Sequence, residues 1–198
     1  IDCYDHTIKY SYIKKISRKN IIYLFNYKNL FNNKLLKQTI KNIFIYKDYK
    51  KFFSDDKRHF RSAIGIGRNK KKVSDIMYNL STFPIFLKID IEGSEYRILD
   101  DLLNFQNKIS GLVIEFHDVD LHKQKIINFI EKFSLNLCHI HGQNPGGREY
   151  LDGNGDPIQI EMTFTSSNNI LSKKPKIPHL LDQPADNRFK EVILNFQN

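Results

Sequence analysis

Runs of apolar residues in the middle of the chain alternate between the spacing of strands and the spacing of helices. Residues 86–91 and 111–117 are short, apolar and rich in β-branched residues, which favours strands buried on both faces. Residues 94–103 and 119–133 repeat their apolar positions at the helical period. This alternation predicts an α/β fold with a doubly wound, mostly parallel sheet.

The pattern changes after the second of these helices. Two further strands are predicted at residues 135–142 and 158–164, and the loop between them is rich in Gly, Asn, Asp and Pro. Their closeness along the chain favours an antiparallel pair. Residues 152–156 of the loop resemble the start of a calcium-binding loop, but Pro157 stands where that loop requires glycine, so turn formation is the better interpretation.

Weaker patterns precede the central strand. They predict strands at residues 1–7, 21–25 and 59–66, and helices at residues 8–17, 35–53 and 74–80. Ser74 is expected to cap the last of these helices, and a break near Asn42 stays open.

The two ends of the chain differ from its middle. The opening residues already predict a strand that ends in an acid, as if an earlier strand and helix were missing. We therefore expect a single domain over residues 1–198, truncated at its N-terminus and lacking its first strand. Residues 168–198 contain several prolines and are expected to form a tail that wraps the surface.

Acidic side chains stand where the central strand ends. Asp90 and Glu92 precede a glycine turn at Gly93, and Ser94 is expected to cap the helix that follows. Ligands bind open α/β sheets at the carboxyl ends of the strands, so the two acids are site candidates. The alternative is that they only solvate a strand end and stabilise the start of a helix.

The next strand also ends in side chains that can bind ligands. Glu115 and His117 point to the same face because strand side chains alternate. With Asp90 they could hold a divalent cation, and this donor set suits magnesium, manganese or iron. Alternatively, His117 is a general base whose basicity a neighbouring carboxylate raises. A third interpretation is that Glu115 and His117 merely satisfy each other.

Two other motifs carry less information. His139 and His141 end a later strand, and a structural role is expected for both. Residues 65–67 form a Gly-Ile-Gly sequence after a predicted strand, but no third glycine follows. A strand end that turns away from the sheet explains them better than a cofactor fingerprint does.

Composition narrows the partners. The net charge of +9 makes nucleic acid a candidate partner, because positive charge attracts phosphate. The lysines are dispersed, however, and the one tight basic run is residues 68–72, so nucleic-acid binding is not expected. The two cysteines are expected to be reduced. No membrane span or signal segment is predicted, so we expect a cytoplasmic protein, and a homo-oligomer stays open.

Several of these segments, in this order, resemble the sequence blocks of FkbM-type methyltransferases. The resemblance covers residues 1–184 and is carried by residues 88–96 (KIDIEGSEY), 112–117 (LVIEFH), 141–144 (HGQN), 161–164 (EMTF) and 181–184 (LDQP).

The resemblance implies a Rossmann-like class I fold and S-adenosylmethionine as the methyl donor, with a hydroxyl of a sugar or polysaccharide as the acceptor. It places Asp5, with His6 beside it, at the adenosine ribose, and Asp90 and Glu92 beside the methyl group. His117 or a carboxylate would take the acceptor proton. Related sugar methyltransferases use a magnesium ion, which implies a metal role for the set formed by Asp90, Glu115 and His117.

One part of the family pattern is missing from the sequence. The glycine motif of the first strand, which cradles the methionine part of the cofactor, has no counterpart here. Truncation is the favoured explanation, because a sheet without its first strand would lack its middle. The alternative is a catalytically inactive methyltransferase-like protein that binds glycans or acts as a scaffold.

Overall fold

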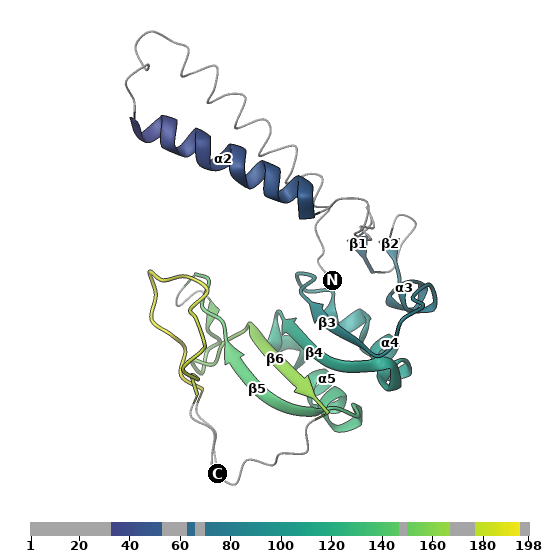
Figure 1. Cartoon of the computed structure of the whole chain (residues 1–198). Helices are drawn as coiled ribbons and strands as arrows, with labels where there is room; N and C mark the ends of the chain where they lie inside the picture. The colour runs from purple at the N-terminus through teal and green to yellow at the C-terminus, as the bar shows by residue number, and fades with distance from the viewer. Residues whose placement is uncertain (1–32, 53–62, 66–69, 147–149, 167–176, 195–198) are drawn as a thin grey trace. The chain divides into compact units, whose positions relative to one another are not determined.

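The structure is a computed structural model that describes residues 33–52, 63–65, 70–146, 150–166 and 177–194 (Figure 1). The chain divides into a smaller unit within residues 4–63 and a larger one within residues 64–198.

Helix α2 (Asn33–Phe52) and Ala63 are the described residues of the smaller unit. It confirms the helix predicted at residues 35–53, and it is continuous at Asn42, where Gln38 Nε2 donates a hydrogen bond to Asn42 Oδ1 over 3.1 Å. Side chains four residues apart face each other on a helix, so this bond spans one turn. Among the described helices, none has the length and apolar character needed to cross a membrane.

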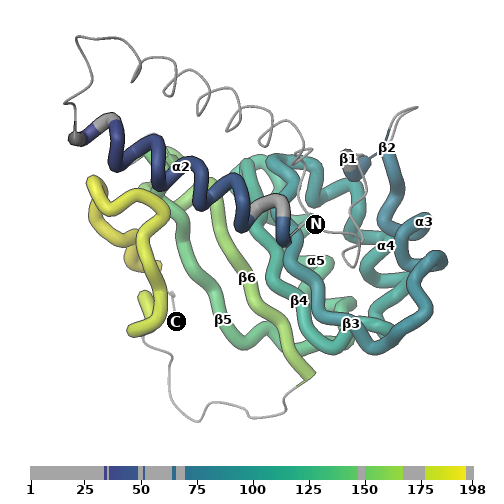
Figure 2. Tube along the Cα trace, turned by 45° about the horizontal axis from the view of Figure 1, so that its top comes forward, coloured from purple at the N-terminus to yellow at the C-terminus, as the bar shows by residue number. Residues whose placement is uncertain are grey.

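The larger unit is built on a four-stranded sheet with the order β3-β4-β6-β5 (Figure 2). The strands are β3 (Ile85–Ile89), β4 (Ile109–Phe116), β5 (Asn136–Gly142) and β6 (Ile160–Thr165). Strands β3 and β4 pair in parallel, whereas β6 is antiparallel to both β4 and β5. The predicted antiparallel pair is therefore confirmed. Strand β5 runs in the same direction as β3 and β4, so three of the four strands are parallel in direction, as predicted. Because β6 is inserted between β4 and β5, however, only one of the three hydrogen-bonded pairs is parallel.

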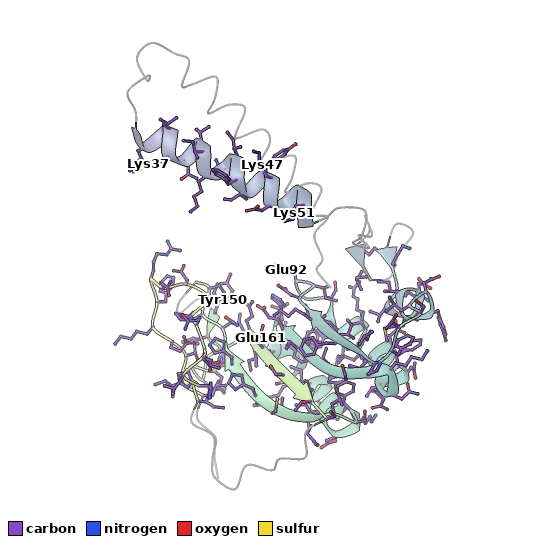
Figure 3. All side chains as sticks on the ribbon, viewed as in Figure 1. Lys37, Lys47, Lys51, Glu92, Tyr150 and Glu161 are labelled. Carbon is purple, nitrogen blue, oxygen red and sulfur yellow. The ribbon has the colours of Figure 1, made fainter. Side chains whose placement is uncertain are left out.

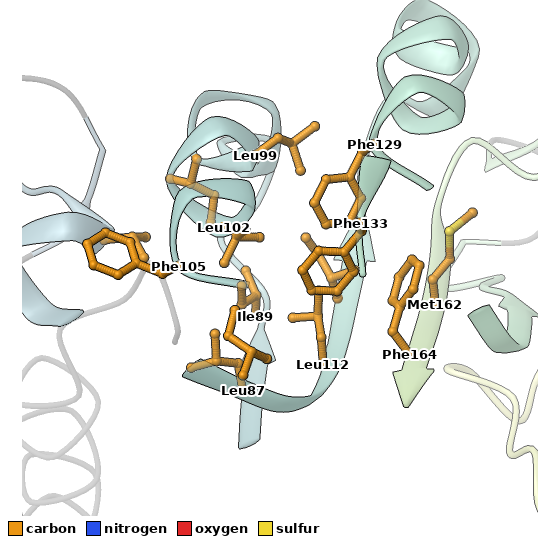
Figure 4. Packing of buried hydrophobic residues seen from close by; sticks show 14 of the residues in the cluster. Leu87, Ile89, Leu99, Leu102, Phe105, Leu112, Phe129, Phe133, Met162 and Phe164 are labelled. Carbon is orange, nitrogen blue, oxygen red and sulfur yellow. The ribbon is translucent and has the colours of Figure 1, made fainter. Parts of the chain in front are cut away.

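One face of this sheet carries the hydrophobic core. Alternate residues of β4, Leu112, Ile114 and Phe116, are fully buried. Helices α4 (Leu99–Asn104) and α5 (Val119–Lys132) cover them, and Phe129 of α5 stacks on Phe133 at 4.8 Å between ring centroids (Figure 4). The alternate side chains on one face of the strands thus pack against the apolar stripes of the two helices.

The helix predicted at residues 94–103 is divided. A short 3-10 helix, η2 (Glu95–Arg97), precedes α4, and Ile98 separates them. A second 3-10 turn, η3 (Gln106–Lys108), leads into β4.

Ser74 does not cap the following helix. Helix α3 (Val73–Tyr78) begins one residue earlier than predicted, and the carboxylate of Asp75 accepts a hydrogen bond from Lys72 N over 3.1 Å. The backbone N–H of Ser74 instead donates to Asp101 Oδ2 at 3.1 Å. The prediction failed because the helix already begins at Val73, so Ser74 lies inside the first turn and its own N–H is one of the free amides.

Short strands and turns complete the described residues. Strands β1 (Ala63–Ile64) and β2 (Lys70–Lys71) form a separate two-stranded sheet, and β1 is the described part of the strand predicted at residues 59–66. In the loop before β6, Asp152 Oδ1 accepts hydrogen bonds from Asn154 N and Asp156 N, at 2.8 and 2.9 Å. These bonds confirm turn formation in the Gly- and Asp-rich loop.

Residues 177–194, called the C-terminal segment below, contain no helix or strand. They lie against edge strand β5, where two histidines contact acids of the segment. His139 Nε2 lies 2.8 Å from Asp182 Oδ1, and His141 Nε2 lies 2.6 Å from Glu191 Oε1. Both histidines thus have a structural role, as expected.

Replacing Leu112 with alanine is expected to lower the free energy of unfolding by about 2–5 kcal/mol, because the side chain is fully buried in the central strand and its loss leaves a cavity. Urea unfolding measures the change. Leu121→Ala on α5 is the matched control, since Leu121 is 74% exposed and its truncation should change stability by less than about 0.5 kcal/mol. Equal effects of the two substitutions would contradict the described core.

Candidate active site

The polar side chains predicted to meet at the carboxyl edge of the sheet do so. Asp90 directly follows β3, Glu115 lies near the end of β4, and His117 comes just after it. One ligand atom from each of the three lies within 4.8 Å of the others, and all three residues are half-buried. Glu92 and Glu161, both labelled in Figure 3, lie at this same edge, where β3 ends and β6 begins.

The turn after β3 adopts an unusual backbone conformation. Glu92 and Gly93 both have positive φ angles, 53° and 90°. Glycine tolerates this region freely, as expected at Gly93, whereas a residue with a Cβ is strained there. Such a strained conformation persists only where the surrounding structure holds it in place, and it is found most often at functional sites.

Glu95 holds this turn from inside the protein. Its side chain is fully buried, and Oε1 accepts hydrogen bonds from the backbone N–H groups of Ile91 and Gly93, at 3.1 and 3.2 Å. The predicted cap, Ser94, makes no side-chain capping bond. The Ser94 prediction is wrong, because Arg97 N donates at 3.1 Å to the backbone carbonyl oxygen of Ser94 and not to its side chain.

The same carboxylate oxygen faces His117. Glu95 Oε1 lies 3.2 Å from His117 Nδ1. Burial alone would raise the pKa of Glu95, but the hydrogen bond with His117, its backbone bonds and the charge of His117 together hold that pKa below its usual value. Glu95 therefore stays ionised and fixes the orientation of the imidazole ring.

His117 is surrounded by acids on its other side too. Its Nε2 lies 3.5 Å from Glu92 Oε2 and 3.9 Å from Glu115 Oε1. Burial would lower the pKa of His117, but the hydrogen bond with Glu95 and the charges of Glu95, Glu115 and Glu92 raise it. The residue's backbone is fixed as well, because Tyr96 Oη donates to its carbonyl oxygen at 2.5 Å.

Glu115 has a pKa above its usual value. Burial raises the pKa of Glu115, the hydrogen bond donated by Gln159 Nε2 lowers it, and the charge of Asp90 raises it further. Gln159 Nε2 also lies 3.3 Å from His117 Nε2. A carboxylate with a raised pKa next to an imidazole is an arrangement that can bind a cation or take a proton.

Two residues of the site were missed in the sequence. Glu95 is spaced at the helical period from Ile91, Ile98 and Leu102, which are all buried. A charged residue at a position that predicts burial could have identified it. Gln159 precedes β6 in an irregular stretch, and an amide there gives no signal of its own. Asp5 and His6, predicted at the cofactor, lie outside the described residues, as do Ile66 and Gly67.

The fold and the edge cluster define an α/β protein with an acid-lined site at the carboxyl ends of parallel strands. Residues 36–145 match the methyltransferase FkbM domain, which is more than half of the chain. The chain belongs to the FkbM methyltransferase domain family, as the sequence resemblance indicated. Searches of curated proteins and of solved structures returned no match.

Replacing Glu95 with glutamine is expected to lower the pKa of His117 and to lower the free energy of unfolding by about 2 kcal/mol, because a charged hydrogen bond is lost. A raised pKa of His117 stabilises the fold fully below the unfolded value of about 6.5, and this contribution is lost as the pH rises through the folded-state pKa. The decline of stability across that window should therefore be shallower in the variant.

NMR titration of the His117 ring protons and urea unfolding at several pH values, both with EDTA present, measure these changes. Glu92→Gln is the matched control, because Glu92 faces the same ring but its side chain is half exposed. Its effect on the His117 pKa should be smaller, since solvent screens the charge. A larger shift in Glu92→Gln than in Glu95→Gln would contradict the role given to Glu95.

Proposed function

We propose that this protein is an S-adenosylmethionine-dependent O-methyltransferase that acts on a hydroxyl of a sugar or polysaccharide. Membership of the FkbM methyltransferase domain family supports methyl transfer. The observation that carries the proposal is the convergence of Asp90, Glu115 and His117 within 4.8 Å at the carboxyl edge of β3 and β4. That edge is where open α/β sheets bind their ligands.

The sheet supports the Rossmann-like class I fold that the proposal requires. Strands β3, β4 and β5 run in one direction, and β6 is inserted antiparallel between β4 and β5. A parallel sheet that ends in an antiparallel hairpin is the arrangement expected from the sequence resemblance. Helices α4 and α5 cover the apolar face of the sheet, whereas the acids lie at the edge of the sheet.

The charges of the site fit a cationic methyl donor. Asp90, Glu92, Glu95 and Glu115 bring four carboxylates to one edge of a chain whose net charge is +9. S-adenosylmethionine, when bound, supplies a methyl group on a positively charged sulfur, so the methyl–sulfur bond breaks as the acceptor oxygen bonds to carbon. Nearby carboxylates stabilise the positive charge, and the protein must align the acceptor oxygen and accept its proton.

The same residues fit a divalent cation. Asp90 and Glu115 offer oxygen atoms, and His117 offers Nε2 because Glu95 holds Nδ1. A carboxylate behind a ligating histidine is the usual way proteins fix such a ring. A magnesium ion held there would position and acidify the acceptor hydroxyl. Without a metal, His117 Nε2 or Glu115 would take the proton directly, so metal removal separates the two roles.

Full-length protein is expected to bind S-adenosylmethionine and to release S-adenosylhomocysteine when a suitable glycan is present. Calorimetry measures the binding, and transfer of a radiolabelled methyl group measures turnover. Asp90→Asn should reduce turnover by about 100-fold or more, because the residue lies beside the reacting groups. Asp120→Asn on α5 is the control. The absence of any donor binding would favour the alternative, an inactive glycan-binding or scaffold protein.

Manganese is a convenient probe for the metal site, because electron paramagnetic resonance counts the free ion. Glu115→Gln should weaken manganese binding by more than about tenfold, since a charged oxygen ligand is lost, and Glu95→Gln should weaken it by about 10–100-fold through His117. Glu131→Gln, an exposed acid on α5, should leave binding unchanged. Manganese binding equal in all three variants would rule the site out, and activity that survives EDTA would then assign proton transfer to His117 or Glu115.

A further inference from the structure

The two faces of the sheet differ in composition. The face toward α4 and α5 is apolar and includes Leu87, Ile89, Leu112, Met162 and Phe164 (Figure 4). The residues between these point the other way and form what we call the polar face: Phe86, Lys88, Val113, Glu115, Glu161, Thr163 and Thr165. Strands that are covered by apolar layers on both sides are apolar throughout. The composition of the polar face therefore suits contact with water or with a polar ligand.

Phe86 is the large aromatic side chain of the polar face. It is 63% exposed, although a residue of this size is usually buried. A Cβ at Gly111, its partner on β4, would lie 2.7 Å from Phe86 Cδ2 and 2.8 Å from Cε2. The missing side chain at Gly111 thus gives the ring a fixed place against β4. This contact positions the ring without burying it, so most of its surface can contact another molecule.

Charged groups follow Phe86 along the same side of β3. Side chains two residues apart on a strand share a face and lie about 6.6 Å apart, which places Lys88 and then Asp90 in line with the ring. Lys88 Nζ pairs with Glu161 Oε2, and the two side chains are 49% and 28% exposed. Glu161 is also the cross-strand partner of Glu115. The ion pair therefore adjoins the candidate active site and can be reached from solvent.

An aromatic ring beside an accessible ion pair matches the chemistry of a neutral sugar chain. The C–H groups of a sugar ring pack on the negative face of an aromatic ring, and sugar hydroxyls bond to ammonium and carboxylate groups. Four residues separate Phe86 from Asp90, which with Glu115 and His117 forms the acid cluster. This spacing is about 13 Å, longer than one sugar ring. A ligand that contacts both ends has more than one ring.

We propose that the polar face binds the acceptor as an oligosaccharide. One sugar unit lies on Phe86, the next contacts Lys88 and Glu161, and a hydroxyl of the chain reaches the acid cluster. The sheet thereby selects a chain of sugars and not a single sugar. This inference rests on the proposed function and narrows its substrate class.

A fluorescent reporter tests the polar face directly, because the chain contains no tryptophan. Full-length Phe86→Trp protein is titrated with cellotetraose, maltotetraose, mannotetraose and xylotetraose, and with the monosaccharide of each. At least one tetrasaccharide is expected to shift the emission, and its monosaccharide should bind about tenfold more weakly because it contacts fewer groups. Leu121→Trp on α5 is the matched control, since Leu121 is 74% exposed outside the polar face, and its emission should not change.

Saturation-transfer NMR with the same sugars tests the unchanged side chain. Phe86→Ala should weaken tetrasaccharide binding by about tenfold, because the stacking surface is lost. Tyr78→Ala on α3 is the control for removing an exposed aromatic ring, since Tyr78 is 75% exposed, and its binding should equal that of the unchanged protein. If melting shows that Phe86→Ala does not fold, the tryptophan titration still decides.

The outcomes separate this inference from the proposed function. No emission shift with any tetrasaccharide, or equal affinity for a tetrasaccharide and its monosaccharide, overturns the polar-face site. A dimer in sedimentation velocity that Phe86→Ala abolishes also overturns it and assigns the face to a second copy of the chain. Calorimetry measures S-adenosylmethionine binding to the same variants, which should be unchanged. Donor binding without sugar binding rejects the polar-face site alone, and sugar binding without donor binding rejects the methyltransferase proposal.

Discussion

The buried carboxylate of Glu95 is the contact on which the candidate active site depends. One oxygen atom accepts the amides of the turn after β3 and faces the ring that follows β4, so it ties together the ends of two neighbouring strands. A buried charge is costly unless it is paired and hydrogen-bonded, and here both conditions are met for that oxygen. The strained turn at Glu92 and the orientation of His117 both follow from it.

Much of the fold could be predicted because burial imposes a period on the sequence. Residues 85–89 and 109–116 alternate as strands because one face meets α4 and α5, and α5 shows its apolar stripe for the same reason. The caps could not be predicted in this way. Ser74 and Ser94 have the residue type of a cap, but Ser74 lies inside the first turn of α3, and Arg97 N donates to the backbone carbonyl oxygen of Ser94. Residue type alone does not show at which residue a helix begins.

The site was predictable to the extent that it lies at strand ends. Asp90, Glu115 and His117 were found because the carboxyl edges of adjacent parallel strands coincide, and the structure brings their ligand atoms together. Glu95 and Gln159 were not found, because the site residues that they contact are distant from them in the sequence. The position of the C-terminal segment against β5 depends on two histidines that contact acids 43 and 50 residues later in the chain, which no local pattern could reveal.

The position of β6 has a consequence for how the chain acquires its structure. This strand is the last of the four along the chain, yet it lies between β4 and β5. During synthesis, the hydrogen-bonding edges of both earlier strands therefore remain open until residue 165 has left the ribosome. Non-local pairing of this kind slows folding and exposes strand edges to association with other chains. Completion of the sheet, and with it the joining of Gln159 to the acid cluster, is thus a late event.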